Sequence, residues 1–179
     1  MPDRKEIEAL LKKTGFRCMM CGDCCRENTP DSNLILISAE EVRDIIAATG
    51  MKWDEVADPY PDFFEAGGCS VTLAWCLKRK GGQCIFLNND NRCRIYKNRP
   101  WICRTFPFML TDETLIVSEC KNQGLDISGE EAKIQADTII ERKENEEMEF
   151  QKIKMRYENA DISKIKKCVI DSEGVKEIE

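Results

Sequence analysis

Four cysteines fall within eight residues, at Cys18, Cys21, Cys24 and Cys25, and this CxxCxxCC run constrains the chain more than any other feature. Spacers of two residues let a turn direct neighbouring sulfurs inward while backbone N–H groups donate to them, as in zinc knuckles and iron–sulfur loops. A run of C-x2-C-x2-C also begins the cluster loop of bacterial ferredoxins, and it supplies three thiolates from one segment. Zinc sites more often use two separate CxxC pairs, so the spacing favours iron.

The adjacent Cys24 and Cys25 are not expected to bind one ion, because neighbouring side chains diverge on a helix and on a strand. We therefore expect one of the two to face a second site. Two other interpretations stay open for the run. It can be a set of buried free thiols, or it can contain a redox pair or a vicinal disulfide.

Eleven cysteines accompany no histidine, so any metal must sit mainly on thiolates. Outside the run, four cysteines lie at the edges of expected strands and turns: Cys84, Cys93, Cys103 and Cys120. Four local and four remote cysteines make eight, the number that two four-thiolate centres require. Arginines close to these positions can offset thiolate charge, or they can be ordinary solvated surface; they are Arg17, Arg26, Arg92, Arg94, Arg99 and Arg104. Cys69 and Cys76 are expected to be core or loop thiols, and Cys168 an incidental thiol.

The net charge of −6 gives no basic field, so the composition argues against nucleic acid and against an anionic membrane surface as partners. No apolar run approaches the length of a membrane-spanning helix. The first fifteen residues lack the apolar core of a secretory signal. We therefore expect a cytoplasmic protein, in which thiols stay reduced and clustered cysteines indicate metal or redox chemistry.

The pattern predicts an α+β fold, namely a small irregular domain organised by metal, with short helices and antiparallel strands. Gly15 closes a first helix, and the capping box of Ser38 and Glu41 starts a second that ends at Gly50. A meander of short strands follows from residue 70 to residue 96. We expect a cysteine-cluster domain over 1–127 and a helical extension over 128–179, with a long helix and about ten frayed residues at its end.

The sequence resembles the YkgJ-type cysteine-cluster family, whose domain is described as zinc- or iron-chelating and which includes relatives of flagellin lysine N-methylase. Four segments carry the resemblance: Phe16 to Cys25, Cys84 to Leu87, Cys93 to Tyr96, and Arg99 to Phe108. The resemblance implies that the metal ligands are Cys18, Cys21, Cys24, Cys25, Cys84, Cys93, Cys103 and Cys120. It also marks Arg99, Pro100 and Pro107 as motif positions, for which we expect structural roles.

Three functions of different classes remain. The first is a metal-binding protein with one or two 4Fe-4S clusters, or zinc, that acts in electron transfer or as an accessory or assembly subunit. Its long polar helix would dock another protein. The second, implied by the resemblance, is an S-adenosylmethionine-dependent protein-lysine methyltransferase. The chain has no glycine-rich strand-turn-helix for a nucleotide and no C-x3-C-x2-C run, which weighs against it. The third is a zinc-stabilised interaction scaffold. No catalytic residue is assigned.

Overall fold

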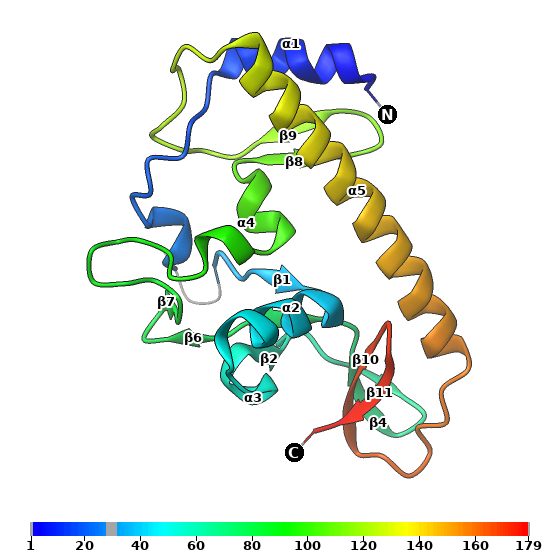
Figure 1. Cartoon of the computed structure of the whole chain (residues 1–179). Helices are drawn as coiled ribbons and strands as arrows, with labels where there is room; N and C mark the ends of the chain where they lie inside the picture. Colours follow the sequence, from blue (N-terminus) through cyan, green and yellow to red (C-terminus); the bar gives the residue numbers. More distant parts are fainter. Residues whose placement is uncertain (1, 28–31, 179) are drawn as a thin grey trace. The chain divides into compact units, whose positions relative to one another are not determined.

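The fold is known from a computed structural model that describes residues 2–27 and 32–178, and the chain divides into two compact units (Figure 1). Unit 1 comprises Met1–Cys21 and Trp101–Glu146, and unit 2 comprises Gly22–Pro100 and Glu147–Glu179. Each unit combines an early and a late segment of the chain. The α+β class is confirmed, since both helices and short antiparallel strands are present.

Unit 1 is built around the packing of a short N-terminal helix on the start of a long one. Its elements are α1 (Arg4–Thr14), α4 (Trp101–Thr105), the hairpin of β8 (Phe108–Leu110) and β9 (Leu115–Val117), and the first part of α5 (Gly129–Glu158). Ile7 and Leu11 of α1 are fully buried with Ala132, Ala136 and Ile139 of α5. The apolar face of each helix therefore finds its partner within the unit.

Both ends of α1 are fixed by local chemistry. Asp3 and Glu6 form a reciprocal capping box at its start. Gly15 ends the helix in the left-handed region, with φ of 58°, and its N–H donates to the Leu11 carbonyl at 2.8 Å. A methyl group at Gly15 would lie 1.9 Å from the Leu125 carbonyl oxygen, so the position has room for glycine alone.

The long helix α5 begins at a capping box, in which Ser128 and Glu131 exchange hydrogen bonds of 2.8 and 3.1 Å. Residues 129–146 belong to unit 1, and residues 147–158 belong to unit 2. Within the second part, Met148, Phe150 and Met155 are more than half exposed. Tyr157 packs edge-on against Phe64, with ring centroids 5.8 Å apart.

Unit 2 contains most of the strands. Its helical elements are η1 (Asp23–Cys25), α2 (Ala39–Thr49), α3 (Trp53–Val56) and η2 (Tyr96–Asn98). Its strands are β1 (Leu36–Ile37), β2 (Ala57–Pro59), β3 (Phe64–Ala66), β4 (Cys69–Thr72), β5 (Trp75–Leu77), β6 (Arg79–Lys80), β7 (Gln83–Cys84), β10 (Lys167–Asp171) and β11 (Gly174–Glu177). One sheet has the order β1-β5-β2 and another β11-β10-β4-β3, while β6 and β7 form a separate hairpin.

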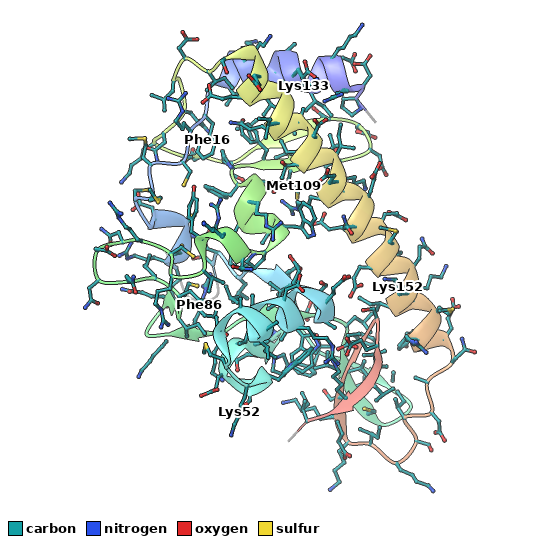
Figure 2. All side chains as sticks on the ribbon, viewed as in Figure 1. Phe16, Lys52, Phe86, Met109, Lys133 and Lys152 are labelled. Atoms are coloured by element: carbon teal, nitrogen blue, oxygen red, sulfur yellow. The ribbon has the colours of Figure 1, made fainter. Side chains whose placement is uncertain are left out.

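The core of unit 2 reaches the cysteines. Ile37, Val42, Val56 and Phe86 lie in one buried cluster, and Cys84 is a member of the same cluster. Phe86, which Figure 2 labels, is 1% exposed. The segment that follows Cys84 is therefore anchored by apolar burial, which fixes the backbone on which the thiol is carried.

The expectation that the last residues are frayed is wrong. β10 pairs in parallel with β4 and antiparallel with β11, and Cys168, Val169 and Ile170 are fully buried. The segment is ordered by β4, a strand almost one hundred residues earlier in the chain, and no local pattern reports such a partner. Within the described parts of the chain, no helix combines the length and the apolar character that crossing a membrane requires.

Candidate metal centre

The CxxCxxCC run turns sharply at its centre. Gly22 adopts φ of 78°, and the single 3₁₀ turn η1 follows, closed by the hydrogen bond from the Cys25 N–H to the Gly22 carbonyl at 3.1 Å. A Cβ at Gly22 would lie 2.8 Å from Nη1 of Arg26 and 3.0 Å from Leu87. The turn therefore needs glycine both for its backbone angle and for its close packing.

This turn is also the boundary between the two units, so the eight expected ligands fall into two sets of four. The unit 1 set is Cys18, Cys21, Cys103 and Cys120. The unit 2 set is Cys24, Cys25, Cys84 and Cys93. Each set takes two cysteines from the run and two from remote parts of the chain, and all eight are free thiols.

Backbone pairing gathers the unit 2 set. Arg26 and Gln83 form an antiparallel bridge, which places Cys25 opposite Cys84 in the same register. A second antiparallel bridge, between Leu87 and Cys93, returns the chain alongside the segment that follows Cys84. Segments that carry sequence-remote cysteines are thus brought together by main-chain pairing.

The two remote thiols of this set sit in matching turns. The Cys84 sulfur accepts the backbone N–H of Phe86, and the Cys93 sulfur accepts that of Ile95, two residues further on in both cases. Burial raises the pKa of both thiols, and these N–H groups lower it. An N–H aimed at a sulfur stabilises the thiolate, which is the form that binds metal.

Cys24 and Cys25 do not diverge as expected. The hydrogen bond to the Cys25 thiol is the largest cause of a raised pKa at Cys24, followed by burial and by the charge of Cys25. The expectation assumed a regular helix or strand, whereas the two residues lie in a single 3₁₀ turn. Both thiols of the pair therefore belong to the unit 2 set.

Arginine side chains act by charge on the thiols of this set. The charge of Arg99 lowers the pKa of Cys24 and Cys93, and Arg94 also lowers that of Cys93. Arg99 is held in place by Tyr96, whose carbonyl accepts from Nε at 2.9 Å and whose ring lies 3.6 Å from Cζ. Positive charge at these positions offsets the excess negative charge of a four-thiolate group.

Arg79 is a residue that the sequence analysis did not single out. It pairs directly with Cys84 across the β6–β7 hairpin and lowers the pKa of that thiol. Its side chain is 11% exposed, and its buried Nη2 has no hydrogen-bond partner among residues 2–27 and 32–178. The sequence does contain a feature that indicates this pairing, because the two-residue turn Gly81-Gly82 places positions 79 and 84 opposite each other.

The other arginines near the cysteines have partners elsewhere. Arg17 pairs with Glu131 at 2.6 Å, and Arg104 stacks on Trp101 at 5.0 Å. Arg92 lies 3.8 Å from Asp90. These contacts are those of ordinary surface side chains.

In unit 1, a different backbone pairing brings the segments of Cys18 and Cys120 together. Gly124 and Leu125 donate to the carbonyls of Thr14 and Gly15, both at 2.9 Å. This places the segment before Cys18 beside the segment after Cys120, and both cysteines pack against the same buried cluster. The Cys21 sulfur accepts from Nδ2 of Asn122 at 3.8 Å.

Cys103 is the fourth member of the unit 1 set and lies on α4, where it is half-buried. The helix is anchored by Arg142 of α5, which donates to Oγ1 of Thr105 at 2.8 Å and to the Phe108 carbonyl at 3.3 Å. The backbone that carries Cys103 is therefore fixed within unit 1.

The three other cysteines are buried in unit 2, as a core interpretation of Cys69 and Cys76 requires. Cys76 contacts the carbonyls of Asp58 and Pro59. Cys168 lies 3.5 Å from Cys69, sulfur to sulfur, inside an apolar cluster. Burial and the Cys69 thiol raise the pKa of Cys168 to about 12, which makes it an inert core thiol.

In the described part of the chain, residues 2–27 and 32–178, no three thiol or carboxylate side chains are already closed around one point as a metal-holding group. The donor chemistry nevertheless fits a thiolate-bound metal. The unit 2 set combines four thiols, two backbone N–H groups aimed at sulfur and an unpartnered guanidinium N–H beside Cys84. These are the groups that stabilise thiolate ligands.

Comparison with known proteins agrees with this chemistry. The family model described as "CxxCxxCC: Putative zinc- or iron-chelating domain" matches residues 17–123. A protein of Methanocaldococcus jannaschii, "Uncharacterized protein MJ0661", is 31% identical over 104 residues, which cover 58% of this chain. The chain spans about half the length of that curated relative, 50%. No solved structure matches the chain.

Proposed function

This chain belongs to the CxxCxxCC family of zinc- or iron-chelating domains, and from that premise we propose that its clustered cysteines hold iron–sulfur clusters used in electron transfer or in the assembly of a partner enzyme. The proposed ligands are those expected from the sequence: Cys18, Cys21, Cys24, Cys25, Cys84, Cys93, Cys103 and Cys120. The proposed partner is another protein.

One observation carries the proposal. Cys25 lies opposite Cys84, and Cys93 returns beside the segment that follows Cys84, through two antiparallel bridges that bring three sequence-remote segments with cysteines together in unit 2. Apolar burial alone does not explain this arrangement, because cores rarely place several thiols next to guanidinium groups. Thiolate ligation does explain it, since it needs both convergence and charge compensation.

The exposure of the thiols indicates how a centre held by the unit 2 set would be surrounded. Cys84 is 9% exposed, whereas the other thiols of the set are partly exposed. A centre held here would have one side in the core and one side near solvent, which suits exchange of electrons with a docked protein. An iron–sulfur cluster supplies one-electron redox chemistry when it is bound.

Arg79, Arg94 and Arg99 would act on the same centre by charge. Their guanidinium groups favour the more negative state of any group held by the thiols. Hydrogen bonds and charges of this kind set the reduction potential of iron–sulfur centres.

The test is purification without oxygen, followed by iron, sulfide and zinc analysis and by electron paramagnetic resonance before and after reduction. We expect iron and sulfide in equal amounts and a paramagnetic signal in one redox state. The variant Cys84→Ser with Cys93→Ser should lose the metal bound by the unit 2 set, and the matched control Cys69→Ala, a buried cysteine outside both sets, should keep all of its metal. Colourless protein with stoichiometric zinc would instead establish a structural zinc domain, and metal-free protein would refute both.

A further inference from the structure

The two sets of cysteines differ in more than their position in the sequence. Each set lies wholly within one compact unit, and the CxxCxxCC run is divided between them at Gly22. Neither set needs a ligand from the other unit to reach four thiols. If the run held one cluster, all four of its cysteines would be expected in the same unit. The division of the run therefore does not fit a single cluster.

We propose that the chain holds two separate four-thiolate metal centres, one bound by Cys18, Cys21, Cys103 and Cys120 and the other by Cys24, Cys25, Cys84 and Cys93. This inference rests on the proposed metal-binding function and specifies its ligands. The run therefore supplies its first CxxC pair to unit 1 and its adjacent pair to unit 2.

The backbone at Gly22 supports the division. The chain enters the left-handed region at this residue, and Arg26 is bridged to Gln83 immediately after η1. Glu27 continues the pairing by donating to the Gly82 carbonyl at 2.9 Å. Cys24 and Cys25 are thus held by unit 2 on their C-terminal side within one or two residues.

Independent contacts hold the first half of the run in unit 1. Besides the pairing of residues 14–15 with residues 124–125, Nε2 of Gln135 donates to the Phe16 carbonyl at 3.0 Å. Phe16 packs edge-on against Phe108 with ring centroids 5.7 Å apart, which ties it to the segment that follows α4. The backbone before Cys18, the segment after Cys120 and the segment after Cys103 therefore share one core.

The first experiment counts metal in the full chain and in two double variants. Cys21→Ser with Cys103→Ser removes two ligands of the unit 1 set, and Cys24→Ser with Cys93→Ser removes two of the unit 2 set. Protein loaded with zinc is measured by native mass spectrometry, and protein purified without oxygen is measured for iron and sulfide. We expect two zinc ions in the parent chain and one in each double variant, with iron and sulfide falling to half in each.

A second measurement on the unaltered chain avoids the risk that a variant does not fold. Protein loaded with zinc is alkylated with N-ethylmaleimide during stepwise removal of zinc by a chelator, and each cysteine is read by peptide mass spectrometry. We expect the two sets to lose protection as two groups, each with its own chelator dependence.

The outcomes separate the inference from the function on which it rests. A parent chain with one metal per molecule, or a unit 1 double variant that keeps all of the metal, would overturn the two-centre inference while leaving metal binding intact. Loss of protection at all eight positions in one step would also overturn the two-centre inference. A parent chain that binds no metal would overturn the proposed function together with the inference.

Discussion

Asp171 offers the sharpest test of how unit 2 is held together. It is 2% exposed at the end of β10, and its Oδ2 accepts from Nε1 of Trp75 at 2.8 Å and pairs with Nζ of Lys176 at 2.7 Å. Its Oδ1 accepts the backbone N–H groups of Glu173 and Gly174. The carboxylate thus closes the turn between β10 and β11 and ties it to β5.

The cost of Asp171→Ala follows from these partners. Trp75 is buried, so its indole N–H is left without an acceptor, which costs about 1–3 kcal/mol. Lys176 is 28% exposed and recovers part of its hydration, so the lost ion pair adds only about 1 kcal/mol. We expect a total loss of about 3 kcal/mol in the free energy of unfolding.

Asp171→Asn should cost about 2 kcal/mol, although it keeps the shape. Donors face both oxygens, so the amide NH₂ of asparagine meets an N–H or an ammonium group in either orientation. Urea unfolding followed by tryptophan fluorescence measures both variants, with Asp62→Ala as the exposed control. A change below about 0.5 kcal/mol for Asp171→Ala would refute the assignment of this buried network.

Three further predictions follow from single contacts. The pKa of Glu173 is lowered to about 2 by the hydrogen bond from Arg43. The stabilising contribution of Glu173 is therefore complete above pH 4.5 and is lost as the pH falls from 4.5 towards 2. In Glu173→Gln, the urea midpoint should fall less steeply over this pH range than in the parent chain. Arg142→Met should destabilise unit 1 by about 1–2 kcal/mol, measured by thermal unfolding, because it orphans the buried oxygen of Thr105; a wild-type melting temperature would contradict this. Gly15→Ala should cost about 2 kcal/mol or more, because it combines a positive φ with a clash, and an unchanged urea midpoint would contradict it.

Helix boundaries could be predicted from the sequence because their determinants are local. The capping box of Ser38 and Glu41 and the cap at Gly50 mark the two ends of α2, and the structure confirms both. Gly15 marks the end of α1, and the box of Ser128 and Glu131 marks the start of α5. In each case the donor, the acceptor and the helix lie within four residues.

The sheets were less predictable because their partners are remote. The residues from 70 to 96 were expected to form one meander of short strands, but β4 and β5 belong to different sheets within unit 2. β10 was missed altogether, since its burial depends on β4 and not on its own neighbours. A sequence window contains no information about pairing over such a distance.

The candidate site could likewise be predicted from the sequence only in part. The cysteines themselves were evident from their spacing, but the assignment of Cys24 and Cys25 to one set required the geometry of η1. The role of Arg79 required the register of the β6–β7 hairpin. Residue type identified the donors, whereas tertiary pairing determined which donors act together.

The central claim is that the eight cysteines of the CxxCxxCC run and of positions 84, 93, 103 and 120 are metal ligands. The most direct measurement is elemental analysis of the wild-type chain purified without oxygen, combined with alkylation of its thiols before and after metal removal. Our account predicts stoichiometric metal and eight thiols that become reactive only when the metal is removed. Metal-free, folded protein in which the partly exposed members of both sets react from the outset would contradict it.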